Sequence, residues 1–64
     1  MFTAREKWKA VERELALRRN VYPRQISTGK LTMREARREL ELMVEIAEDY
    51  RKQAMDEEKE GTLL

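Results

Sequence analysis

The chain has 64 residues, of which 42% are charged and 6% are aromatic, and its formal net charge is +1. A chain of this length forms at most one domain, and it buries only about 60% of its unfolded surface, so a single core is marginally stable. Cysteine and histidine are absent, which excludes disulfides, thiolate metal sites and the commonest general base. We therefore expect no cofactor, and oligomerisation or a bound partner is left to stabilise the fold.

The apolar segments are too short for a membrane protein. No apolar run approaches the roughly 18 residues of a membrane span, and the N-terminus lacks the apolar segment of a signal peptide. We therefore expect no membrane association and a cytoplasmic location.

The first predicted element is a helix that starts after Thr3. Thr3 and Glu6 have the spacing of a capping box, in which the threonine hydroxyl accepts from the Glu6 N–H and the carboxylate reaches back to the Thr3 N–H. Apolar residues then recur on one helix face with spacings of 4, 3, 4 and 7, interrupted by Arg18. They are Ala4, Trp8, Val11, Leu15 and Tyr22, with Ala10, Leu17 and Val21 in a second row.

The single proline and the first glycine mark a break in the chain. Pro23 has no N–H and disfavours helical geometry at the residue before it, so the first helix either stops there or kinks and continues. We favour a kinked helix over about residues 4–28, because Ile26 continues the apolar pattern. Gly29 can adopt the left-handed conformation that ends a helix. A connection this short predicts antiparallel neighbours.

The second predicted helix covers about residues 32–58. Thr32 and Glu35 form another capping box at its start. Apolar residues follow with spacings of 3, 4, 3, 4, 3 and 4, the strongest periodic signal in the chain, and residues 61–64 form a tail. This seam consists of Met33, Ala36, Leu40, Met43, Ala47, Tyr50 and Ala54, and Leu42, Val44 and Ile46 lie beside it.

These elements predict an all-α fold, an antiparallel two-helix hairpin over residues 1–60. Because Gly29 marks the turn, the numbers of facing residues are expected to sum to about 58. This register places Lys9 near Asp49 and Arg13 near Glu45, so cations of the first helix face acidic residues of the second.

Each helix carries an apolar face wider than one neighbouring helix can cover. Exposed patches of this kind usually mark an interface, and cyclic dimers are the commonest assembly. We therefore expect the hairpin to dimerise into a four-helix bundle and to bind a protein partner. The expected interface residues are Trp8, Val11, Leu15, Leu17, Leu40, Leu42, Met43, Val44, Ile46, Ala47 and Tyr50.

Charge is divided between the two parts of the chain. Residues 1–38 contain eleven Lys/Arg and four Asp/Glu, a net charge of +7, and residues 39–64 contain three and nine, a net charge of −6. Contacts within an antiparallel hairpin explain most of this asymmetry. An excess of cations remains at the predicted tip, namely Arg18, Arg19, Arg24, Lys30, Arg34, Arg37 and Arg38.

The basic tip is a candidate site for an anionic partner. Several cations near phosphates would give salt-dependent nucleic-acid binding, which is the alternative function. Against it, the sequence pI of about 8.1 is below the usual value above 9, and the third helix that braces a helix-turn-helix is missing. A solvated basic end and a docking site for an acidic protein are the other interpretations.

No catalytic site is expected, and no enzymatic activity. The second helix has many carboxylates, but no histidine completes a Glu-x-x-His metal pattern. A two-helix hairpin has no concave pocket that excludes water, and the sequence has no glycine-rich phosphate loop and no nucleophile–base pair. The carboxylates concerned, which we interpret as a solvating surface, are Glu41, Glu45, Glu48, Asp49, Asp56, Glu57 and Glu58.

Residues 14–51 carry a resemblance that covers most of the chain. The motifs are Glu-Leu-Ala-Leu-Arg-Arg at 14–19, Tyr-Pro at 22–23, Gly-Lys at 29–30, Glu-Ala at 35–36, Met43, and Ile-Ala-Glu-Asp-Tyr-Arg at 46–51. In these the chain resembles a group of short uncharacterised proteins found in bacterial, phage and prophage genomes. The resemblance implies a phage-related accessory factor that acts by binding, and it assigns no functional residues.

Overall fold

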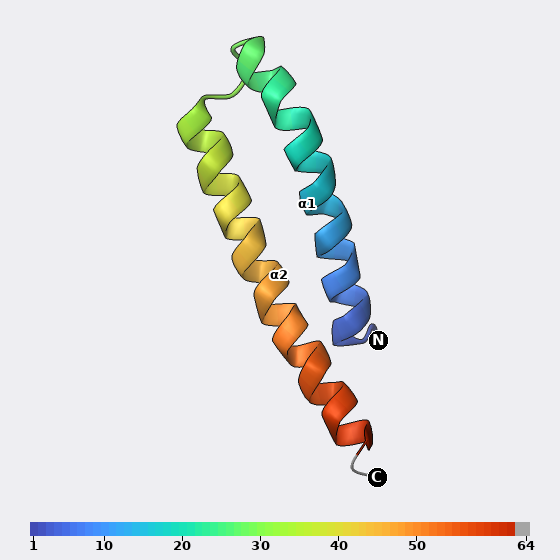
Figure 1. The fold of residues 1–64 in the computed structure, drawn as a ribbon. Coiled ribbons are helices and arrows are strands. Elements are labelled where there is room, and N and C mark those ends of the chain that lie inside the picture. The colour runs from blue at the N-terminus through green and yellow to red at the C-terminus, as the bar shows by residue number, and fades with distance from the viewer. Residues whose placement is uncertain (63–64) are drawn as a thin grey trace.

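The protein is a helical hairpin in a computed structural model, which describes residues 1–62, and the side chains up to residue 59 (Figure 1). Helix α1 spans Ala4–Ser27 and helix α2 spans Met33–Thr62, and the two run antiparallel (Figure 1). The molecule is a rod of 53 × 16 × 16 Å. Its radius of gyration is 15.2 Å, whereas a globular chain of this length has about 11 Å. The predicted all-α hairpin is confirmed.

Both helices begin at the predicted threonines. Thr3 Oγ1 accepts from the Glu6 N–H at 3.1 Å, and Thr32 Oγ1 accepts from the Glu35 N–H at 3.1 Å. Each bond satisfies one of the backbone donors that the first turn of a helix leaves without an intrahelical partner. At Thr32, the Glu35 carboxylate accepts from the threonine hydroxyl at 3.0 Å rather than from the backbone N–H expected in a capping box.

Pro23 lies inside α1, and the helix continues beyond it to Ser27. The first helix therefore continues through the proline, as favoured, and the kink expected there stays a prediction. Because proline lacks an N–H, the carbonyl of Arg19 loses its intrahelical donor, and the pyrrolidine ring crowds the same carbonyl.

We expect Pro23→Ala to raise the free energy of unfolding by about 1 kcal/mol. Alanine restores the missing hydrogen bond, although it also gives the unfolded chain more conformational freedom. Chemical denaturation followed by circular dichroism measures the change. A marked loss of stability in this variant would show that the proline holds the tip in place.

The turn after α1 is a Schellman motif centred on Gly29. The Lys30 N–H donates to the Gln25 carbonyl at 2.9 Å, and the Gly29 N–H donates to the Ile26 carbonyl at 3.1 Å. These are the two bonds of that motif, which needs a left-handed residue directly after the C-cap. Gly29 has φ +79° and fills that position, as the sequence predicts.

We expect Gly29→Val to lower the free energy of unfolding by at least about 1 kcal/mol. A β-branched residue resists the left-handed region. A Cβ at this position has nothing within 4 Å, so the loss reports backbone strain and not a clash. Gly29→Asn is the control, because asparagine tolerates this conformation and should lose less. Equal melting temperatures for the valine variant and the parent would contradict the assignment.

Helix α2 extends past the predicted end near Glu58, to Thr62. Gly61, expected to open the tail, lies within the helix. A glycine in a helix costs about 1 kcal/mol relative to alanine, which weakens a helix without stopping it. The rest of the predicted tail, residues 63–64, lies outside the described residues.

The predicted register agrees with two contacts between the helices, one in the tip half and one in the first turns of α1. Arg18 Nη1 lies 3.6 Å from Glu39 Oε2, and Lys7 Nζ lies 5.9 Å from the centre of the Tyr50 ring, so both pairs are within one residue of the expected sum. At the open end Glu57 Oε2 accepts from the Ala4 N–H at 3.3 Å. That N–H belongs to the first turn of α1, so the end of α2 caps the start of α1.

The ion pairs between the helices join other residues than the two charge pairs that the register is expected to bring near each other. Among the described side chains, Arg5 pairs with Glu58 and Arg18 with Glu39, and neither Lys9 with Asp49 nor Arg13 with Glu45 forms an ion pair. Lys9 Nζ instead lies over the Trp8 ring, 4.7 Å from its centre. Arg18 and Glu39 lie within one residue of the expected sum of 58, whereas Arg5 and Glu58 sum to 63, because a long side chain can reach a partner several residues along the neighbouring helix.

The core of the hairpin is narrow and consists of small residues. The buried side chains are Ala4, Leu15, Ala36, Ala47 and Ala54, and none of the described polar side chains is buried. Met33 was expected on the same seam, yet it is 69% exposed. It is the first residue of α2, and at about 100° per residue it points about 60° away from Ala36.

Candidate functional site

The expected interface residues divide into two groups in the structure. Leu15 and Ala47 are buried between the helices. Six others are half-buried at the edges of the seam between the helices: Trp8, Val11, Leu40, Met43, Ile46 and Tyr50. The remaining three, Leu17, Leu42 and Val44, are exposed. The first group therefore holds the hairpin together, and the exposed group is free to meet another molecule.

One side of the seam is an open groove in the tip half of the rod. Its floor is apolar and comes from both helices, with Ile26 of α1 facing Met33, Leu40 and Val44 of α2. The charged side chains on its rim are Arg19, Arg37, Glu41 and Glu45. We call this surface, with Ala36 at its base, the tip groove.

Sequence reasoning missed part of the tip groove. Ile26 was placed on the apolar face of the first helix but not in the interface, and Met33 was placed on the seam. A signal was present, because Met33, Arg37, Leu40 and Val44 have spacings of 4, 3 and 4. These residues form a second row parallel to the seam. Arg37 interrupts its apolar pattern, so the row was not recognised as an apolar surface.

The opposite side of the seam carries a polar network around Arg18, next to a shallow hollow on α1. Its Nε donates to Glu14 Oε1 at 3.1 Å, and its Nη1 donates to the Tyr22 hydroxyl at 3.2 Å and lies 3.6 Å from Glu39. The hydrogen bonds to Glu14 and to Tyr22 raise the pKa of the Arg18 guanidinium. Glu39 points about 140° around α2 from Val44, so this network lies away from the tip groove.

The basic tip is smaller than the sequence suggests. Arg18 is taken up by its ion pairs with Glu14 and Glu39, so it does not contribute a free charge. The other six cations are exposed and form no ion pair with a described residue: Arg19, Arg24, Lys30, Arg34, Arg37 and Arg38. They are distributed over the last turns of α1, the turn and the first turns of α2 (Figure 1).

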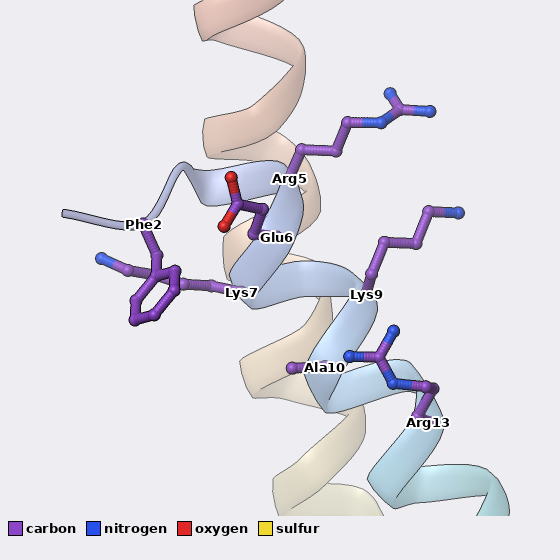
Figure 2. Close-up of a pocket in the computed structure, with 7 residues that line it drawn as sticks. All are labelled: Phe2, Arg5, Glu6, Lys7, Lys9, Ala10 and Arg13. Carbon is purple, nitrogen blue, oxygen red and sulfur yellow. The ribbon is translucent and has the colours of Figure 1, made fainter.

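A second hollow lies on α1 near the N-terminus (Figure 2). Its side chains project outward from α1 and spread to both sides, so no set of polar groups converges on one point (Figure 2). Glu6 is the one acid among four cations in its wall. The residues that line it are Phe2, Arg5, Glu6, Lys7, Lys9, Ala10 and Arg13. The arrangement is a solvated helix surface without the enclosure that a ligand pocket has.

The acidic half of α2 is held by local contacts. Arg51 Nε donates to Glu48 Oε2 at 2.9 Å, one turn away on the same helix. This hydrogen bond lowers the pKa of the Glu48 carboxyl and raises that of the Arg51 guanidinium. Within the described part of the chain, no three acidic side chains lie close enough to hold a metal ion, and neither helix is long and apolar enough to cross a membrane.

Comparisons with protein-family models, curated proteins and solved structures found no match for this chain. The tip groove is a hollow to which both helices contribute residues.

Proposed function

We propose that the chain is a non-enzymatic helical interaction protein of the cytoplasm that associates with a second copy of itself and binds a protein partner. The observation that carries the proposal is the contrast between core and surface. Among the described residues, the buried side chains are four alanines and one leucine, whereas eight large apolar side chains are at least 42% exposed. A pair of helices that buries so little gains stability from further helices packed on its faces.

The total surface of the chain supports self-association. The hairpin exposes 5568 Å². A compact protein of its mass, 7.7 kDa, exposes about 4,300 Å² by the scaling of surface with mass. The excess of about 1,200 Å² exceeds the roughly 800 Å² that each partner buries in a standard interface.

The resemblance to short phage and prophage proteins supports a partner of a second kind. We take that resemblance to favour binding over catalysis, and the exposed apolar residues outside the tip groove, such as Leu17 and Val21, provide a surface for such a partner. A partner on this surface leaves the tip groove available to the second copy.

Sedimentation equilibrium of the full chain at micromolar concentration tests the proposal. We expect a mass of twice 7.7 kDa, together with a melting temperature that rises with protein concentration. A compact monomer that melts cooperatively, at a temperature independent of concentration, would contradict self-association.

A second candidate function is association with nucleic acid, and the six unpaired cations of the tip favour it. Their binding to phosphates would weaken steeply with salt. Electrophoretic mobility shift at two salt concentrations tests this, using a variant in which Arg24, Arg34 and Arg38 are replaced by glutamine. Salt-dependent binding that the variant loses would support the candidate, and equal binding by both proteins would reject it.

A further inference from the structure

We infer that the tip groove is the surface on which a second copy of the chain docks, with the two α2 helices antiparallel across a two-fold axis. The inference rests on the proposed self-association and specifies its face and direction. It follows from the apolar floor of the groove, the order of charges along its rim and the polar network that occupies the opposite side.

The floor of the groove presents side chains that the hairpin itself does not cover. Met33 is 69% exposed and Val44 is 42% exposed, and Ile26 and Leu40 are half-buried between them. The four side chains come from both helices, so an occupant would contact α1 and α2 together. On the opposite side of the seam, Arg18 and its partners Glu14, Tyr22 and Glu39 occupy the corresponding position.

When two copies pack with their α2 helices antiparallel, the two outer charges on the rim of α2 face charges of opposite sign. Arg37 lies toward the tip and Glu45 lies eight positions further along α2, about 12 Å away at 1.5 Å per residue. A two-fold axis between them reverses this order in the second copy, so each Arg37 meets the partner copy's acidic position and each Glu45 meets a basic one. Neither residue has an ion-pair partner within the described hairpin.

The same axis brings the apolar residues of the two grooves together. The midpoint between residues 37 and 45 is Glu41, with Leu40 one residue before it and Val44 three residues after it. Val44 of one copy therefore lies within two residues, about 3 Å along the helix, of the position facing Leu40 of the other copy. Glu41 is at the midpoint, so the Glu41 side chains of the two copies approach each other. Arg19 of α1 lies on the same rim and supplies a positive charge that offsets their repulsion. The product is a four-helix bundle in which the two tips point in opposite directions.

The first test compares two lysine substitutions on opposite edges of α2. Val44 and Leu42 are two residues apart and similarly exposed, at 42% and 50%. Val44→Lys is expected to raise the dimer dissociation constant at least about tenfold, because it places a charge in the apolar floor twice per dimer. Leu42→Lys is expected to change it by less than about threefold. Sedimentation equilibrium measures both, and circular dichroism checks that each variant stays helical.

The second test uses charge reversal, which does not depend on the apolar floor. Arg37→Glu and Glu45→Arg should each weaken the dimer about tenfold, because two attractive pairs become repulsive. A mixture of the two single variants should form a heterodimer, since every contact at these positions is then between opposite charges. Recovery of the dimer on mixing also shows that each variant retains its fold.

The outcomes separate the docking face from the proposed function. If Leu42→Lys dissociates the parent dimer and Val44→Lys does not, the tip groove is not the docking face, although self-association still holds. A dimer unaffected by either charge reversal would overturn the antiparallel arrangement. A parent chain that is a stable monomer would reject both the inference and the self-association on which it rests.

Discussion

Leu15→Ala is expected to lower the free energy of unfolding by about 2–5 kcal/mol. Leu15 is 4% exposed and is the one large side chain in a core that otherwise consists of alanines. Its removal leaves a cavity between two helices that have no other large buried residue to close over it. Since small domains are stable by about 5–15 kcal/mol at most, the loss approaches the whole stability of the fold.

The change is measured by urea denaturation followed by circular dichroism, at a protein concentration that is the same for all variants. Leu17→Ala is the matched control, because Leu17 lies two residues away on α1 and is 59% exposed. We expect the control to change stability by less than about 0.5 kcal/mol. Equal losses in the two variants would mean that the seam of α1 is misplaced.

Ala47→Leu is expected to lower the free energy of unfolding by about 1–3 kcal/mol. Ala47 is 5% exposed, in the middle of α2, and with Ala36 and Ala54 it forms a row of small residues along which the helices approach. A leucine has no space at this position unless the helices separate, and separation uncovers Leu15.

Gln53→Leu is the control for the larger side chain, because Gln53 is exposed on the same helix. It adds an apolar group of similar size without entering the core, so its effect should be within about 0.5 kcal/mol. Thermal unfolding at matched concentration compares the variants. A rise in stability in Ala47→Leu would contradict close packing at the alanines and indicate a space between the helices.

The sequence by itself determined the features that depend on a few neighbouring residues. Thr3 and Thr32 start the helices because a threonine hydroxyl reaches the N–H three residues on, whatever lies around it. Gly29 ends α1 because its backbone can adopt φ +79° without strain. The seam that contains Leu15 and Ala47 follows from helical spacing, so the hairpin and its approximate register were predictable.

The tertiary structure alone decided which side chains meet across the two helices. Arg18, counted among the free cations of the tip, is bound by Glu14 and Glu39, and Glu57 caps the first turn of α1. Spacing along the chain gives the face of a residue but not the direction of a long side chain, and ion pairs depend on that direction.

The tip groove was decided in the same way. Ile26 and Val44 form one surface because they lie on the same side of the seam, which depends on how the antiparallel helices are rotated about their axes. A residue about 100° further around its helix, such as Gln25 beside Ile26, points away from this surface. Local sequence therefore placed the apolar rows on each helix, and only the packing of one helix on the other left an apolar row open on one side and placed a polar network on the other.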